Sequence, residues 1–205
     1  PVSMEQARVW YGRAAEQGDA KAQCNLAIVH ANGEGGPVSM EQARVWYERA
    51  AEQGLAQAQF NLALLHENGQ GGPVSMEQAR VWYGRAAEQG YAEAQCNLAI
   101  MHYSGEGGPV SMDQARVWCG RAAEQGHAQA QYNLAFMHKK GEGGPVSLEH
   151  AMFWFKRAAA QGDNTAMQIV QQAESTCLSC GKRRASGENM KSCSGCKCAI
   201  YCSKG

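Results

Sequence analysis

Residues 37–72 read PVSMEQARVWYERAAEQGLAQAQFNLALLHENGQGG, and this 36-residue stretch recurs along most of the 205-residue chain. Near-copies begin at Pro1, Pro73 and Pro109, and a partial copy begins at Pro145. All five prolines and all five tryptophans fall at the same two positions of the repeat. Self-similarity at a fixed period of this length is typical of solenoids, in which each unit packs only against its neighbours.

One unit encodes a pair of helices. Ser39, three residues before Gln42, has the capping-box pattern, which predicts a first helix over about Met40–Gln53. Gly54 suits the left-handed conformation that ends a helix, and a second helix should follow over about Ala56–Glu67. Apolar residues recur in both segments at spacings of three and four. Each helix therefore has one face to bury, and the pairs must stack.

Two kinds of side chain should form the core. Small residues let the two helices of a unit approach closely, namely Ala50, Ala51, Ala58 and Ala63. The large aromatic column is expected to be buried and to dominate the interfaces between units, through Trp10, Trp46, Trp82, Trp118 and Trp154.

The pattern A-x-x-x-L-A-x-x-H-x-x-G-x-G-G, followed by A-x-x-W-x-x-x-A-A-x-x-G, resembles Sel1-like repeats, which are related to tetratricopeptide repeats. Ala63 and His66 depart from it, because glycine and tyrosine are usual at their positions. The resemblance implies an all-α, right-handed α-solenoid of stacked helical hairpins over residues 1–174, and a role as a scaffold or adaptor rather than catalysis. Its units are 1–36, 37–72, 73–108, 109–144 and 145–174, called units 1 to 5 below.

Four other columns, one of histidines and three of charged residues, point to no ligand site. A histidine recurs near the end of each second helix in His30, His66, His102 and His138. Stacked helices lie ~8–10 Å apart whereas Zn–N bonds are ~2 Å, so a capping or packing role in place of tyrosine is favoured over metal binding. Charged columns interleave along the first helices, namely Arg8, Arg44, Arg80 and Arg116, then Arg13, Arg49, Arg85 and Arg121, with Glu16, Glu52, Glu88 and Glu124. With a formal net charge of zero, they indicate a mixed-sign solvated face, not a nucleic-acid stripe.

One position of the unit varies freely, and it holds Asp19, Leu55, Tyr91, His127 and Asp163. In a solenoid such variation usually marks exposed surface. Two interpretations stay open here, selection of a partner and drift on a solvated surface.

The nine cysteines are unevenly placed. Cys24, Cys96 and Cys119 lie within repeats at positions where other units carry an aromatic residue, and we interpret them as small apolar substitutes. The other six crowd residues 177–202. They include two C-x2-C pairs and one later residue, which are Cys177 and Cys180, Cys193 and Cys196, and Cys202.

Two C-x2-C pairs predict a tetrahedral Zn²⁺ site. Residues 175–205 hold few large apolar side chains, so the metal should supply the folding energy of this small segment. One zinc could be bound by Cys177, Cys180, Cys193 and Cys196 alone. Cysteines paired in this way favour a reducing compartment, the cytoplasm or the nucleus.

The spacing C-x2-C…C-x2-C-x5-C, with Tyr201 before the last cysteine, resembles the start of a MYND-type zinc finger. The resemblance implies two cross-braced zinc sites. Cys177, Cys180 and Cys202 would be three ligands of one site, and Cys193 and Cys196 would be half of the other. It also implies binding of proline-containing peptides from partner proteins. The remaining cysteine and histidine ligands of such a finger are absent from the sequence, which makes both sites incomplete.

The main functional hypothesis is a non-catalytic protein–protein adaptor that binds zinc through residues 175–205. One alternative is a non-catalytic fragment of a larger enzyme, since MYND-like fingers also occur beside methyltransferase domains. The other is a nucleic-acid-binding zinc protein that uses the basic residues Lys182, Arg183 and Arg184. No catalytic Ser-His-Asp or Cys-His arrangement stands out, so no enzyme is expected. No run approaches 18 apolar residues, so no membrane span is expected either. The start at a repeat boundary suggests a fragment of a longer protein.

Overall fold

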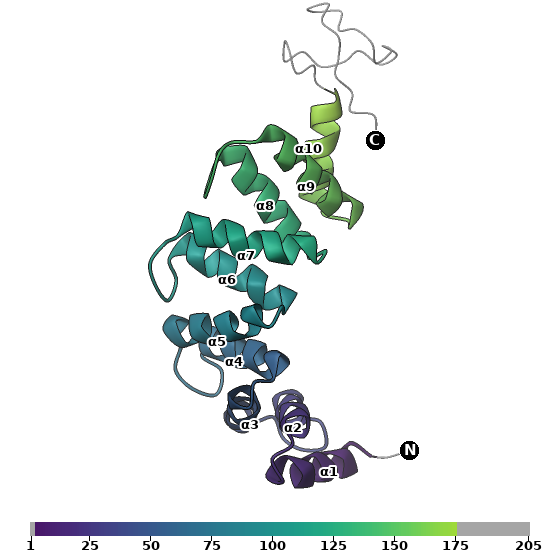
Figure 1. The fold of residues 1–205 in the computed structure, drawn as a ribbon. Coiled ribbons are helices and arrows are strands. Elements are labelled where there is room, and N and C mark those ends of the chain that lie inside the picture. Colours follow the sequence, from purple (N-terminus) through teal and green to yellow (C-terminus); the bar gives the residue numbers. More distant parts are fainter. Residues whose placement is uncertain (1–2, 176–205) are drawn as a thin grey trace, which may run out of the picture.

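A computed structural model describes residues 3–175 of the chain. Within these residues the chain forms ten helices and no strand, as α1 (Met4–Glu16), α2 (Ala20–Asn32), α3 (Met40–Glu52), α4 (Ala56–Asn68), α5 (Met76–Glu88), α6 (Ala92–Ser104), α7 (Met112–Glu124), α8 (Ala128–Lys140), α9 (Leu148–Ala160) and α10 (Asn164–Ser175). Figure 1 shows the helix pairs stacked one above another from α1 to α10 as an elongated solenoid. The predicted solenoid of helical hairpins is confirmed, and the hand of its superhelix stays a prediction.

The helix ends follow the signals in the sequence. The Oγ of Ser39 accepts a hydrogen bond from the backbone N–H of Gln42 at 3.3 Å and so caps α3. Gly54 has a φ of +90°, and the N–H groups of Gly54 and Leu55 bond back to the carbonyls of Ala51 and Ala50 in a Schellman motif. The predicted helix boundaries are confirmed to within one residue at each end.

The core lies mainly between units. Helix α4 packs more extensively against α5, the first helix of the next unit, than against its own partner α3, and the other units follow the same rule. The predicted small residues are almost fully buried, which confirms that prediction, and they are Ala50, Ala51, Ala58 and Ala63.

The tryptophan column does not form the core as predicted. Trp82 and Trp154 are buried, whereas Trp46 and Trp118 are half-buried and Trp10 is 62 % exposed. The tryptophan of one unit packs against the preceding unit, as Trp46 does against Leu26, and no unit precedes Trp10 among the described residues. The residue after each tryptophan goes deeper instead, in Tyr47, Tyr83, Cys119 and Phe155.

A ladder of buried glutamines joins the units. Gln59 on α4 donates from Nε2 to the carbonyl of Ala51 at 3.0 Å. Its Oε1 accepts from Nε2 of Gln89, the C-cap of α5, at 2.7 Å. The same two bonds recur around Gln23, Gln95 and Gln131. Since each buried amide is satisfied from two units, the ladder sets how one unit sits on the next.

Candidate protein-interaction surface

The first helices of the units carry a repeated apolar stripe on their outer side. Its members are separated by one repeat and stay exposed at 40 to 53 %, in Val9, Val45, Val81, Val117 and Phe153. Isolated exposed valines need no explanation, but an exposed apolar side chain at the same position of every unit is a repeated feature of the solenoid. We call these five side chains the valine stripe.

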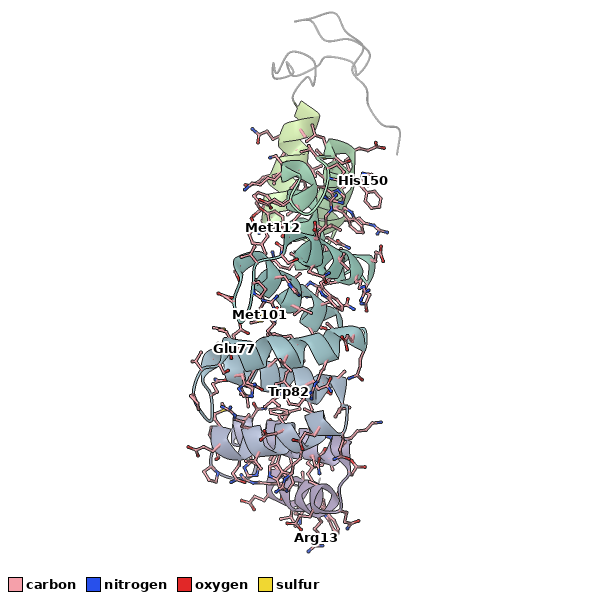
Figure 2. All side chains as sticks on the ribbon, turned by 60° about the vertical axis from the view of Figure 1, so that its left-hand side comes forward. Arg13, Glu77, Trp82, Met101, Met112 and His150 are labelled. Atoms are coloured by element: carbon pink, nitrogen blue, oxygen red, sulfur yellow. The ribbon has the colours of Figure 1, made fainter. Side chains whose placement is uncertain are left out.

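Arginines and tryptophans pair beside the valine stripe. The guanidinium carbons of Arg49, Arg85 and Arg121 lie 4.5, 4.4 and 4.5 Å from the ring centroids of the tryptophans three residues earlier. Arg13 lies over the exposed Trp10 in the same way, at the N-terminal end of the stack in Figure 2. These contacts hold each arginine in place on the surface, and Trp10, Trp46 and Trp118 leave part of their rings exposed beside it. Arginine and aromatic side chains are enriched in protein interfaces.

A shallow hollow of about 430 Å³ opens between α5 and α7. Val81 and the Arg85 side chain line one side, and Trp118 from the next unit lines the other. Glu77 and Glu88 also line it, so charge of both signs borders the hollow. In Figure 2, Glu77 and Trp82 lie at the level of α5, in the middle of the stack.

An arginine and a histidine pair at the base of this hollow. We call this pair and its equivalents in the other units the arginine–histidine clasp. Arg80 on α5 contacts Nδ1 of His102 on α6 through Nη2 at 2.7 Å. The other units form the same pair at 2.6 to 3.1 Å, namely Arg8 with His30, Arg44 with His66 and Arg116 with His138. A guanidinium can only donate, so Nδ1 accepts and the imidazole carries its proton on Nε2.

The clasp also holds the loop between units. Nη1 and Nη2 of Arg80 donate to the carbonyls of Glu106 and Pro109, at 3.3 and 3.2 Å. A Cβ on Gly108 would lie 2.6 Å from Nη1, so a side chain at this position would displace the guanidinium from its partners. The carbonyl of His102 accepts the N–H of Ser111 at 2.8 Å, which ties the clasp to the N-cap of α7.

This geometry corrects one interpretation and supports another. The Arg44 column is not a solvated charge face, because each guanidinium is half-buried against a histidine and a loop. The histidines pack as structural groups, as predicted. Burial, and then the neighbouring arginine, lowers the pKa of each of them below its ordinary 6.5, in His30, His66, His102 and His138.

The freely varying position is the N-cap of the second helix. Asp19, His127 and Asp163 cap α2, α8 and α10 through their side chains. Leu55 and Tyr91 make no such bond and pack on the core instead. Variation at this position therefore replaces a capping hydrogen bond with a packing contact, so it is not variation of a merely solvated surface residue.

The predicted zinc ligands lie outside the described residues. They are Cys177, Cys180, Cys193, Cys196 and Cys202. Within residues 3–175, no group of three or more His, Cys, Asp or Glu side chains is placed to bind a metal. Cys24, Cys96 and Cys119 are buried free thiols, which agrees with their interpretation as apolar substitutes. In the described part of the chain, no helix has the length and hydropathy to cross a membrane.

Stacked two-helix units with a recurrent clasp and ladder define an α-solenoid repeat protein. The sequence model of the Sel1 repeat matches residues 1–19, 20–55, 56–91, 92–127 and 128–163, and the chain belongs to this family. Each full match joins the second helix of one unit to the first helix of the next, the pair that packs most extensively. Comparison with curated proteins found no significant match.

Two solved structures are similar over most of the chain. A Sel1 repeat protein from Oxalobacter formigenes is 34 % identical over 84 % of this chain, with a TM-score of 0.77. A protective antigen of uropathogenic Escherichia coli with an SLR fold is 32 % identical over 82 %, with a TM-score of 0.77. The chain spans 50 % of the first protein and 36 % of the second.

Proposed function

We propose that this chain is a non-catalytic adaptor that binds another protein along the valine stripe. The observation that carries the proposal is the recurrence of this exposed apolar column beside cation–π pairs, on helices locked together by buried hydrogen bonds. A rigid surface loses little conformational entropy on binding. The described residues offer charge of both signs around the hollow, which favours a protein over a nucleic acid.

The test replaces the stripe with charge. In the variant V45E/V81E/V117E, glutamates interrupt the apolar column on three neighbouring units. The matched control is V38E/V74E/V110E, which changes valines that are at least as exposed but lie in the loops between units. Partners would be captured by cross-linking from cell extract with the wild-type chain, identified, purified and titrated against all three proteins.

The proposal predicts that the stripe variant loses the purified partner and the loop variant keeps it. Equal binding by both variants would contradict it, provided that circular dichroism shows both to be folded. Loss of binding by the loop variant alone would move the site away from the stripe.

We further propose that residues 175–205 form a zinc-binding unit of the adaptor. The support is the donor set: Cys177, Cys180, Cys193 and Cys196 form two thiolate pairs with the spacing Zn²⁺ prefers, and Cys202 follows as a further ligand. By its resemblance to a MYND-type finger, this unit would bind proline-containing peptides. Because thiolates that bind zinc must stay reduced, we also propose a reducing compartment for the chain, the cytoplasm or the nucleus.

Native mass spectrometry of the full chain tests the zinc proposal. We expect bound zinc in the wild type and its loss in C177S/C180S, with helical content unchanged because neighbouring repeats stabilise each other. A matched C24S/C96S variant removes two cysteines from the repeats and should keep the metal. Absence of zinc from the wild type purified with added zinc would contradict the proposal.

A further inference from the structure

The pair of residues that meet in the buried contact between consecutive units differs from one junction to the next. The residue after each tryptophan meets a residue of the second helix in the preceding unit. Between units 2 and 3 these are Tyr83 and Phe60, with ring centroids 5.7 Å apart. Between units 4 and 5 they are Phe155 and Tyr132, also at 5.7 Å. Each of these junctions is filled by two aromatic rings.

The junction between units 3 and 4 has no ring at either position. Cys119 stands where unit 3 has Tyr83, and Cys96 stands where unit 2 has Phe60. Both thiols are buried in one apolar cluster. The junction between units 1 and 2 pairs Cys24 with Tyr47 and so keeps one ring. The described residues form four junctions between units. Of these, only the junction between units 3 and 4 has no ring at either of the two positions.

The missing ring leaves a hollow of about 370 Å³. Aromatic and aliphatic side chains of α6 and α8 surround it, with Cys119 of α7 at its inner end. Its walls include Ile100, Tyr103, Tyr132, Phe136 and Met137. Ile100 and Tyr103 are 42 and 37 % exposed, so the hollow opens to solvent between α6 and α8. This opening lies on the second helices and is separate from the valine stripe.

Tyr83 shows which group fits such a space. Its ring is fully buried, and its hydroxyl donates to Oε2 of Glu67 on the preceding unit at 2.5 Å, with Asn97 of its own unit as a second partner. In the hollow, Tyr103 stands at the position of Glu67 and Asn133 at the position of Asn97. The Tyr103 hydroxyl already donates to Oε1 of Glu142, and Oδ1 of Asn133 accepts from Nε2 of Gln129. The space therefore keeps apolar walls for a ring and the Asn133 amide nitrogen as a donor for a hydroxyl.

We infer that this hollow binds the ring of a tyrosine side chain from a partner protein. The inference rests on the proposed function in that the ring is supplied by a bound protein. The partner's phenol would replace the ring that the chain provides for itself at the neighbouring junction, with its hydroxyl toward the Asn133 amide. Its backbone would stay outside, over the exposed edge formed by Ile100.

The Cys119 thiol is not a reactive group of this hollow. Its Sγ donates to the carbonyl of Ala130 at 3.3 Å, which turns the thiol toward the backbone of α8. Burial raises the pKa of this thiol to about 12, so it stays protonated and is a poor nucleophile. The hollow is accordingly a site for non-covalent binding.

The test titrates the full chain with two probes, p-cresol and N-acetyl-L-tyrosinamide. The first is the side chain of tyrosine alone, and the second carries backbone groups on both sides. Binding is followed by the NMR signals of ¹³C-labelled methionine methyl groups. Met137 lines the hollow. Met101 holds the equivalent position next to Tyr83 and serves as the internal control.

Both probes should shift the Met137 signal saturably and leave Met101 unchanged. The variant C119Y fills the hollow from within and should weaken both probes by about tenfold or more, the factor that ~1.4 kcal/mol represents. The matched control V110Y adds a tyrosine at an exposed loop position just before α7 and should bind like the wild type. If C119Y does not fold, C119M fills part of the same space with a flexible side chain and should weaken binding in the same direction.

Each other outcome overturns the inference. Binding of p-cresol alone would mean that the hollow takes a free small aromatic molecule and not a side chain of a protein. No shift with either probe, or equal binding by wild type, C119Y and C119M, would mean that the hollow is not a ring site. The p-cresol result does not depend on the valine stripe, so failure of the proposed function and failure of this inference can be told apart.

Discussion

The junctions between units 2 and 3 and between units 3 and 4 are nearly identical in sequence but differ in how they fill space. Both have the glutamine ladder with almost the same bond length, and an arginine–histidine clasp is present in unit 2 and in unit 3. One is filled by the rings of Phe60 and Tyr83, and the other has Cys96 and Cys119 beside a hollow. The comparison shows that the recurrent hydrogen bonds set the spacing of the units, whereas the residue after the tryptophan decides whether the space between them is filled.

The largest expected effect comes from emptying the filled junction. Tyr83→Ala should lower the free energy of unfolding by about 3–5 kcal/mol, because a fully buried ring is lost and a cavity remains. Urea unfolding followed by circular dichroism measures this. Tyr103→Ala, at an exposed position of the next helix, is the control and should cost about 1 kcal/mol or less. Equal losses for both variants would mean that the ring column does not hold the units together.

The glutamine ladder should have the second largest effect. Gln95→Ala leaves the carbonyl of Ala87 and the amide of Gln125 without their buried partner, at a cost of about 2–3 kcal/mol in the free energy of unfolding. Gln57→Ala removes an exposed glutamine from another second helix and should change it by less than about 0.5 kcal/mol. The ladder would be dispensable if the two variants unfolded at the same urea concentration.

Lowering the pH should gradually lower the free energy of unfolding through the histidines of the arginine–histidine clasp. The pKa of His66 and of its three equivalents is below 6.5 in the folded chain, so the unfolded chain takes up protons first. Stability should therefore be constant above pH 6.5 and fall as the pH drops from 6.5 toward 5. Thermal melting across this range measures the slope. The variant H66F/H102F should show a shallower slope than the wild type, and an identical slope would exclude the clasp as its source.

The smallest expected effect concerns helix capping. The carboxylate of Asp19 accepts the N–H of Ala22, and Asp19→Ala should cost about 1 kcal/mol. Lys21→Ala, at an exposed position of the same helix, is the control. Hydrogen exchange of the first turn of α2 reports the loss locally, and unchanged exchange would show that the cap has no role.

Much of the fold could be predicted from particular residues. Ser39, Gly54 and Gly69 mark helix ends by local chemistry, which needs no knowledge of the neighbours. The prediction for the tryptophans was right for Trp82 and Trp154 and wrong for the other three, because periodicity assigns a tryptophan and the residue after it to the same face without showing which goes deeper. Their depth depends on the stacking of the next unit, which is a tertiary property.

The ladder and the clasp were not predicted, although both had a signal in the sequence. Gln59 recurs in every complete unit among the apolar residues of the second helix, and an invariant polar residue on a buried face requires a partner. Arg44 was read as a surface charge, because its partner is 22 residues away on another helix. The burial of the repeat cysteines as small apolar substitutes was predicted, but the hollow beside Cys119 follows only from the packing.

The most direct test is whether Cys119→Tyr raises or lowers the free energy of unfolding. Placing a larger side chain in a well-packed core usually lowers the free energy of unfolding by about 1–3 kcal/mol. If the space beside Cys119 has the shape of the ring that Tyr83 supplies one unit earlier, Cys119→Tyr should raise the free energy of unfolding by about 1–2 kcal/mol, as burial of a ring predicts. Urea unfolding of wild type and variant decides this. A stabilised variant is the predicted result, and a destabilised one would contradict the claim that this junction has an unfilled ring site.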